Sequence, residues 1–263
     1  MSQNKNNMGG ASRTVKTSDA LETTTRVGKT KAATNKKPVK STRAFPKQYA
    51  VQPENFAGRI PCYIDEAGRW PLAGPVWVGI VSQAKIIWSN KPAQNIAQEK
   101  QLAPFRDSKQ CTPAQRDEMY DALNDMTGNG SIVYASGHAS AAYIDRHGIV
   151  AALRHSIIQA VEKLGYGADE VVLIIDGNTD FGLRSKGFLV QSIIKWDSTV
   201  AAISAASIVA KVERDRYMVR IDKQYPRYGF EQHKGYGTSF HMEAIRKYGQ
   251  SKEHRKSFIH LHE

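Results

Sequence analysis

Residues 171–176 have the sequence Val-Val-Leu-Ile-Ile-Asp, five consecutive apolar residues followed by an acid. A strand with one wet face alternates apolar and polar residues, so an uninterrupted apolar run is typical of a strand buried on both faces. The pattern therefore predicts a central strand over 171–175 that ends at Asp176. Strands of this kind belong to sheets that are covered by helices.

Further strands and helices are predicted on both sides of this segment. Short β-rich runs predict strands over 60–64, 75–81, 131–136 and 189–194. Caps and helical spacing of apolar residues predict helices over 113–126, 141–164, 201–218 and 242–247. The helix over 201–218 is unusually rich in Ala and Ser, so we expect it to pack very closely against another element. Strands that alternate with helices indicate an α/β domain with a mixed sheet.

The composition excludes several classes of protein. With 41% hydrophobic and 24% charged residues in 263, the chain has the balance of a globular protein and not that of a collagen-like or wholly disordered one. No window approaches the roughly 18 apolar residues of a membrane helix, and residues 1–10 lack the apolar core of a secretory signal. Cys62 and Cys111 are too few for a disulfide framework. We therefore expect a cytoplasmic protein with reduced thiols.

The net charge of +12 is concentrated at the N-terminus. Residues 1–50 hold eleven Lys and Arg residues against two acidic ones, which leaves only +3 for the other 213 residues. Because this segment has almost no bulky apolar residues, we expect residues 1–48 to be a disordered basic tail and residues 49–263 to form the folded domain. The tail suits a nonspecific nucleic-acid anchor, since Lys and Arg displace counterions from phosphates. A solubilising extension and a transit peptide are the alternatives.

Acidic residues follow three of the predicted strands. Asp65 and Glu66 come after the strand over 60–64, Asp176 after the central strand, and Asp197 just after the strand over 189–194. Because ends of neighbouring strands lie about 5 Å apart, these carboxylates can converge although they are distant in sequence. Taken singly, such acids more often cap helices or form salt bridges. Together they predict a site for Mg²⁺ or Mn²⁺ and, beside a basic surface, two-metal phosphodiester hydrolysis.

Acidic and basic residues also alternate along the helix that starts at residue 201. The acids Glu213, Asp215 and Asp222 lie among Arg214, Arg216 and Arg220. Solvated ion pairs on an exposed helix face are the default expectation for such a pattern.

Seven motifs, in the same order along the chain, resemble those of bacterial ribonuclease HII. The resemblance covers about residues 60–258 and leaves the tail unexplained. The motifs are Tyr63-Ile64-Asp65-Glu66-Ala67-Gly68-Arg69 with Pro71-Leu72-Ala73-Gly74-Pro75-Val76, Asp107-Ser108-Lys109, Ile175-Asp176-Gly177, Lys195-x-Asp197, residues 204–216, residues 228–238, and His254-Arg255-Lys256-Ser257-Phe258.

The resemblance implies a ribonuclease H-like fold, in which helices flank a mixed five-stranded sheet and the C-terminal portion is helical. It implies an endonuclease that hydrolyses the RNA strand of RNA–DNA hybrids. It also implies cleavage on the 5′ side of single ribonucleotides in duplex DNA, as in ribonucleotide excision repair, leaving 3′-hydroxyl and 5′-phosphate ends. We expect such an enzyme to act as a monomer on nucleic acid, away from membranes.

The resemblance also assigns roles to individual residues. Four acids would be both catalytic residues and ligands of two Mg²⁺ or Mn²⁺ ions: Asp65, Glu66, Asp176 and Asp197. Gly68 and Arg69 would read the ribose 2′-hydroxyl through backbone groups, with Trp70 beside them. Tyr236 would stack on the next deoxyribose, and Lys109 would lie near the substrate backbone. A 2′-hydroxyl is the group that distinguishes RNA from DNA, and glycine permits close backbone approach, so these roles are physically consistent.

Two tryptophans depart from the pattern of the family. Trp70 stands where a third small residue usually completes Gly-Arg-Gly, and Trp196 also replaces a commonly small residue. The rings either pack away and leave the backbone contacts intact, or crowd the substrate and weaken recognition of single ribonucleotides. Two alternatives stay open: a hybrid-only nuclease of the ribonuclease HIII type, whose usual opening motif departs from Glu66-Ala67-Gly68-Arg69, and a non-catalytic nucleic-acid-binding module. The four intact acids disfavour the second alternative.

Overall fold

The computed structural model describes residues 56, 58–83, 102, 104–176, 178–193 and 201–260. The predicted tail, its boundary with the folded domain, and the positions of Trp196 and Asp197 lie outside these residues. The described strands are β1 (Ile60–Ala67), β2 (Val76–Gln83), β3 (Ile132–Ala139), β4 (Val171–Asp176) and β5 (Leu189–Ile193). The described helices are η3 (Ser108–Gln110), α2 (Pro113–Gly128), α3 (Ala141–Lys163), η4 (Arg184–Lys186), α4 (Ala201–Gln224), α5 (Phe230–His233), α6 (Ser239–Tyr248) and η5 (Lys256–Phe258).

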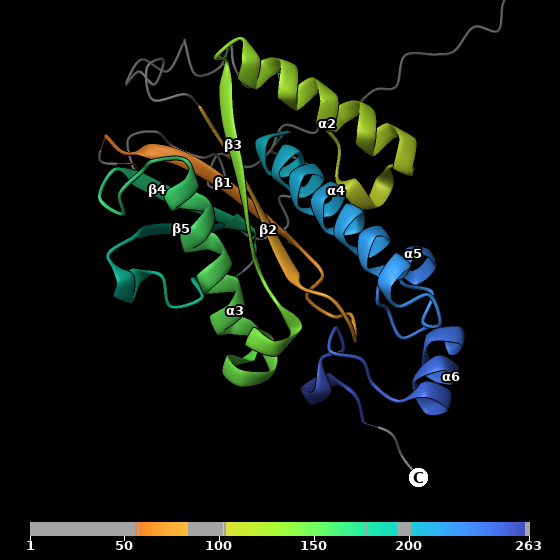
Figure 1. Cartoon of the computed structure of the whole chain (residues 1–263). Helices are drawn as coiled ribbons and strands as arrows, with labels where there is room; N and C mark the ends of the chain where they lie inside the picture. The colour runs from red at the N-terminus through yellow and green to blue at the C-terminus, as the bar shows by residue number, and fades with distance from the viewer. Residues whose placement is uncertain are drawn as a thin grey trace, which may run out of the picture. The chain divides into compact units, whose positions relative to one another are not determined.

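The five strands form one mixed sheet in the order β3-β2-β1-β4-β5. Strands β1, β2 and β3 pair antiparallel, whereas β4 runs parallel to both β1 and β5 (Figure 1). The run of five apolar residues forms β4, in which residues 171–175 are at most 1% exposed. The predicted α/β class and mixed five-stranded sheet are therefore confirmed.

Helices cover both faces of the sheet. On one face α3 packs over β2 and β3, and the apolar side chains between them include Leu153 and Ile157. On the other face α4 and α2 enclose a second cluster that includes Leu123 and Ile208. Thr112 begins α2 with a capping box, since its side chain accepts from the Gln115 backbone and the Gln115 side chain accepts in return.

Two glycines allow the helices to approach the sheet closely. A Cβ atom added at Gly79 of β2 would lie 2.2 Å from the carbonyl oxygen of Ala206 in α4. A Cβ atom at Gly137 of β3 would lie 2.0 Å from the carbonyl oxygen of Ser156 in α3. The expectation that the Ala- and Ser-rich helix packs very closely is thus confirmed. This helix is α4, and it packs against β2.

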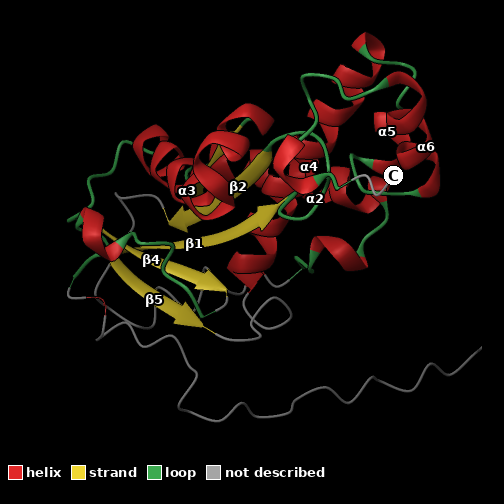
Figure 2. Ribbon diagram, turned by 90° about the horizontal axis from the view of Figure 1, so that it is seen from below, coloured by secondary structure: helices red, strands yellow, loops and turns green. Residues whose placement is uncertain are grey.

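The C-terminal portion is helical, as expected. Helices α5 and α6 lie together beyond the end of α4, to one side of the sheet (Figure 2). A third apolar cluster centred on Met218 and Phe230 joins this portion to α4. No helix among the described residues combines the length and apolar character needed to cross a bilayer.

The first strand is longer than predicted. It continues through Asp65 and Glu66 to Ala67, because β2 pairs with it as far as Ala67, which lies opposite Trp77. The two acids therefore lie within the C-terminal end of β1 and not after it. Their backbone is held by a neighbouring strand, which fixes the direction of each side chain.

Candidate active site

The strand register brings Asp65 and Asp176 to neighbouring positions. Strands β1 and β4 pair in parallel up to Ile64 opposite Ile175, so the two aspartates follow at the next position of each strand. Side chains alternate between the faces of a strand. Asp65 therefore shares a face with Tyr63, and Asp176 with Ile174, both of which belong to the cluster beneath α4. Glu66 projects from the opposite face of β1.

A chain of hydroxyl groups holds Asp65 against α4. The Ser207 side chain hydrogen-bonds to Asp65, and its Oγ lies 2.7 Å from the Oγ of Ser108. The backbone N–H of Glu66 also donates to Asp65 Oδ1 at 2.8 Å. Two segments that the sequence analysis singled out, 107–109 and 204–216, thus meet at this carboxylate.

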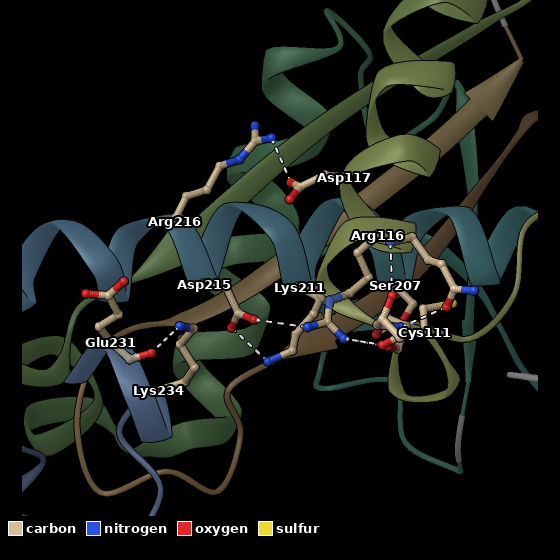
Figure 3. A network of polar contacts seen from close by, with 12 residues as sticks. Cys111, Arg116, Asp117, Ser207, Lys211, Asp215, Arg216, Glu231 and Lys234 are labelled. Carbon is tan, nitrogen blue, oxygen red and sulfur yellow. Dashed lines mark hydrogen bonds and ion pairs between the residues drawn. The ribbon is translucent and has the colours of Figure 1, made fainter. Parts of the chain in front are cut away.

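Arg116 of α2 links the segment that carries Ser108 to α4, by hydrogen bonds on one side and an ion pair on the other (Figure 3). The guanidinium of Arg116 donates to the carbonyl oxygens of Ser108 at 3.1 Å and Cys111 at 2.7 Å. It also lies 3.8 Å from Asp215, which accepts from Lys211 at 2.7 Å. These contacts fix the position of Ser108 and therefore support the hydrogen bonds to Asp65.

Burial makes negative charge costly at this end of the sheet. Desolvation raises the pKa of Asp65 to about 7, and the charge of Glu66 adds to the effect. The pKa of Glu66 is also raised, mainly by burial, although Arg69 and Lys109 oppose the shift. Asp176 contributes a further repulsion on Glu66. An added positive charge would therefore favour the ionised form of these carboxylates.

The donor atoms suit a hard divalent cation, which prefers carboxylate oxygen. Within the described part of the chain, however, no three His, Cys, Asp or Glu side chains stand close enough to hold a metal ion. Asp65, Glu66 and Asp176 are neighbours, but these three side chains alone do not form a complete metal-binding site. The fourth predicted ligand, Asp197, lies outside the described residues.

The predicted substrate-binding residues lie on two joined loops and on η3. Arg69 lies 3.6 Å from Glu66, and its guanidinium carbon is 5.4 Å from the Trp70 ring centre. Trp70 is 75% exposed and Tyr236 is 45% exposed. Their loops are joined by the hydrogen bond from Leu72 N to Gly235 O, at 2.8 Å. Trp70 therefore does not pack into the core, and Trp196, the other ring in that alternative, lies outside the described residues.

The expectation of solvated ion pairs along α4 is wrong at two positions. Arg214 is 0% exposed, because it lies under the loop that follows β1. Glu213 accepts hydrogen bonds from the Trp77 indole at 3.2 Å, the Tyr120 hydroxyl at 3.0 Å and the Ser136 hydroxyl. Uncharged donors thus satisfy Glu213, whereas Arg216 on the exposed side of α4 does form a solvated ion pair, with Asp117.

Comparisons with known proteins identify the family. The family model for ribonuclease HII matches residues 63–262. The ribonuclease HII of Delftia acidovorans is 38% identical over 219 residues, which are 83% of this chain and 83% of that protein. The chain belongs to the ribonuclease HII family. It is therefore an endonuclease that acts on the RNA of RNA–DNA hybrids, and the predicted enzyme class is confirmed.

Solved structures show the same fold. In the structure of the PCNA:RNase HII complex from Archaeoglobus fulgidus, the matching chain is 18% identical, with a TM-score of 0.57 over 78% of this chain and 97% of that one. The crystal structure of Bst-RNase HIII in complex with Mn²⁺ has a TM-score of 0.55 at 14% identity, over 80% of this chain and 70% of that one. The predicted ribonuclease H-like fold is thus confirmed for this member of the ribonuclease HII family.

Two residues near the site were not predicted to have a role, namely Ser207 and Arg255. Ser207 lies within a recognised motif, but its contact with Asp65 depends on the packing of α4 over β1. Arg255 donates to main-chain oxygens nearly 190 positions earlier in the chain. Partners of this kind leave no side-chain pattern that a single sequence can reveal.

Proposed function

We propose that this enzyme cuts duplex DNA on the 5′ side of single ribonucleotides as well as the RNA strand of hybrids. The products would carry 3′-hydroxyl and 5′-phosphate ends. The observation that supports the proposal is the register of β1 and β4, which puts Asp65 and Asp176 at neighbouring strand positions, with Glu66 close enough to interact electrostatically with both. We further propose that it works as a cytoplasmic monomer in ribonucleotide excision repair, with the basic N-terminal segment adding nonspecific affinity for nucleic acid.

The four acids Asp65, Glu66, Asp176 and Asp197 would hold two Mg²⁺ or Mn²⁺ ions. Bound there, such a pair of ions would supply an activated water and would stabilise the leaving oxygen. The protein holds Asp65 in place through Ser207 and Ser108, and it confines the charge of Glu66 with Arg69. The raised pKa of Asp65 supports this role, because a nearby cation favours the ionised carboxylate that burial alone disfavours.

Substrate recognition would come from the exposed groups beside the acids. Gly68 and Arg69 would read the 2′-hydroxyl through their backbone, Tyr236 would stack on the following deoxyribose, and Lys109 would contact the phosphate backbone. Trp70 would extend the contact surface, since its ring is largely exposed next to Arg69. An aromatic face can stack on any base or sugar, so this ring suits nucleic acid without dictating sequence.

A cleavage assay on three duplexes tests the proposal. One carries a single ribonucleotide in DNA, one is a continuous hybrid, and one is DNA alone. With Mg²⁺, the wild-type enzyme should cut the first two and spare the third. Asp65→Asn and Asp176→Asn should lose at least about a thousandfold in turnover while still binding the hybrid, because each removes a metal-binding charge. Near wild-type turnover in either variant would contradict the assignment.

A matched control is Asp117→Asn, which makes the same change at an exposed acid paired with Arg216. It should leave turnover unchanged. The second candidate function, a hybrid-only nuclease of the HIII type, is favoured by one feature, the large Trp70 ring at a position that is usually small. Cleavage of the hybrid alone by the wild type, with junction cutting gained in Trp70→Gly, would establish that alternative. Binding without cleavage would instead indicate a non-catalytic module.

A further inference from the structure

Two arginines are buried completely beneath the loop that links β1 to β2. Arg214 of α4 and Arg255 near the C-terminus are both 0% exposed. Within the described residues, their guanidinium hydrogen bonds go to main-chain carbonyl oxygens and none goes to a carboxylate. A buried cation without an acidic partner is costly, and burial lowers the pKa of both groups, that of Arg255 to about 9.

Arg255 fastens both ends of this loop. Its Nη2 donates to the carbonyl oxygen of Gly68 at 2.6 Å and its Nη1 to that of Arg69 at 3.1 Å. Its Nε donates to the carbonyl oxygen of Gly74 at 2.8 Å. One rigid, planar guanidinium thus fixes the separation between the start and the end of the loop, which a single ammonium group could not do.

Arg214 supports the same loop from α4. Its Nε donates to Pro75 O at 3.0 Å, and its Nη2 donates to Ala73 O at 3.2 Å and to Lys234 O at 2.9 Å. A Cβ atom at Gly68, where φ is +87°, would lie only 2.0 Å from the Nε of Arg214. Glycine at position 68 is therefore needed on the inner side of the loop, where the guanidinium lies, and also for the backbone conformation.

Main-chain contacts join the C-terminal segment to this loop. Arg255 N donates to Leu72 O at 2.8 Å and Gly74 N donates to Glu253 O at 2.8 Å, with an isolated bridge between Ala73 and His254. The backbone of Arg255 is thus fixed as firmly as its side chain. The loop cannot move without breaking contacts to α4 and to the C-terminal segment together.

The direction of these carbonyls determines the direction of the amides. In a trans peptide, the C=O of one residue and the N–H of the next point in opposite directions. Since Gly68 O and Arg69 O point inward to Arg255, the N–H groups of Arg69 and Trp70 point away from it. Neither amide donates a hydrogen bond to any residue that the structure describes. Two adjacent donors are therefore available beside Glu66 for a ligand oxygen.

We propose that Arg255 and Arg214 are positioning residues for recognition of the ribose: they hold the loop so that the amides of Arg69 and Trp70 face the ribonucleotide. The inference rests on the proposed function, because the ligand oxygen belongs to the ribonucleotide unit of the substrate. The two cations also hold a positive potential under the loop, which strengthens the outward N–H groups as donors to the ribose oxygen.

The test compares the KM for a duplex with one ribonucleotide with the inhibition constant Ki of the all-DNA duplex of the same sequence. Arg255→Lys keeps the charge but cannot span three carbonyls, so the KM should rise about 10- to 100-fold, as expected when a recognition loop is displaced by about 1 Å. The Ki should change less than about twofold, since DNA offers no 2′-hydroxyl. Arg214→Lys should also raise the ratio of the KM for the ribonucleotide duplex to the Ki for the DNA duplex. A partly unfolded sample lowers the apparent kcat and moves neither constant.

The matched control is Arg184→Lys, which removes a guanidinium bond to a carbonyl oxygen, that of Val190, on the far edge of the sheet. Its KM to Ki ratio should equal that of the wild type. An unchanged ratio in both Arg255→Lys and Arg214→Lys, or an equal rise of both constants, would overturn the inference. A wild type that does not prefer the ribonucleotide duplex would instead overturn the proposed function.

Hydrogen exchange keeps the test decisive if neither lysine variant folds. In the wild type, the amides of Arg69 and Trp70 should exchange rapidly in the free protein. They should be protected by the ribonucleotide duplex at least about tenfold more than by the DNA duplex, since a hydrogen-bonded amide exchanges only when the bond opens. Equal protection by the two duplexes would refute the outward placement of these donors.

Discussion

Lowering the pH should weaken the fold at the buried contact between His241 and His254. These rings are 0% and 2% exposed, and their Nε2 atoms lie 3.1 Å apart. His241 Nδ1 lies 2.9 Å from Tyr236 O, which can only accept, so His241 carries its proton on Nδ1. His254 Nδ1 lies 2.9 Å from the N–H of Ser251, which can only donate, so His254 carries its proton on Nε2.

The hydrogen bond between the two Nε2 atoms and the backbone contacts at both Nδ1 atoms form together only when both rings are neutral. His254 Nε2–H then donates to the bare Nε2 of His241, and every ring nitrogen has a partner. A proton added to His241 would place two N–H groups against each other. A proton added to His254 Nδ1 would break the hydrogen bond from the N–H of Ser251 and would have the Oγ of Ser251, 2.8 Å away, as its acceptor. Burial, the largest cause, lowers the pKa of each ring from 6.5 to about 4.

The sign and size of the effect follow from these values. Because the unfolded chain binds protons near pH 6.5 and the folded chain only near pH 4, the contribution of the pair is complete above 6.5 and is lost as the pH falls from 6.5 to 4. Between about pH 8 and about pH 5, each ring should remove about 2 kcal/mol from the free energy of unfolding, or about 4 kcal/mol for the pair. His233, which stacks on His241, also has a lowered pKa and adds in the same direction.

The measurement is urea unfolding of the wild type and of a double variant, His241→Asn with His254→Asn, at both pH values. Asparagine keeps an amide donor toward Tyr236 O and an acceptor toward Ser251 N, but it does not titrate. Other groups, including the carboxylates, titrate equally in both proteins, so the difference isolates the pair. The wild type should lose about 4 kcal/mol more than the double variant. Equal losses, or ring pKa values near 6.5 in the folded protein by NMR, would refute the assignment of the neutral pair.

Two further predictions concern packing and the N-terminal segment. Gly137→Ala should lower the free energy of unfolding by about 1–3 kcal/mol, because its Cβ would meet the Ser156 carbonyl of α3, whereas Gly128→Ala has nothing within 4 Å and should be neutral or slightly stabilising in urea unfolding. Equal stability of the two variants would contradict the close packing of α3 on β3. Deletion of residues 1–48 should flatten the salt dependence of hybrid binding by about 0.9 log units per lost phosphate contact, and should spare the cleavage position. An unchanged slope in fluorescence anisotropy titrations would show that the segment does not bind the substrate.

Much of the fold could be predicted because local chemistry decides it. The apolar run of β4 and the Thr112 cap of α2 depend on neighbours in sequence, and both are present in the structure. Asp65, Glu66 and Asp176 were singled out from sequence as strand-terminal carboxylates within recognisable motifs; the structure places them at the ends of β1 and β4, and their metal-binding role stays a prediction. The continuation of β1 through Asp65 could not be predicted, since it depends on pairing with β2, which is not encoded in the strand itself.

The buried residues that hold the candidate site in place were much harder to predict than the acidic residues of the site. Arg214 has acidic and basic neighbours in sequence, so it resembles a surface residue, yet its partners are carbonyl oxygens of the loop over 73–75 and of Lys234. Glu213 likewise looks like half of an ion pair and is satisfied by uncharged donors from β2, α2 and β3. A backbone oxygen is present at every residue, so a contact with one selects no residue type and leaves no pattern.

Helix α4 supports both the acids and the loop after β1, through Ser207 and Arg214, whereas the C-terminal segment contacts the loop through Arg255. Asp65 and Asp176 are fixed by the register of β1 and β4 and by Ser207 of α4. The loop that carries Arg69 is fixed by Arg255, and the loop of Tyr236 is fixed by His241. Loss of the His241–His254 contact, or of the three hydrogen bonds from the Arg255 guanidinium to the loop, should thus weaken ribose recognition without moving the acids. Under the proposed function, selectivity for the ribonucleotide should fail before hydrolysis does, because the Arg255 and His241–His254 contacts lie in the C-terminal portion, whereas the positions of Asp65 and Asp176 depend on the register of β1 and β4.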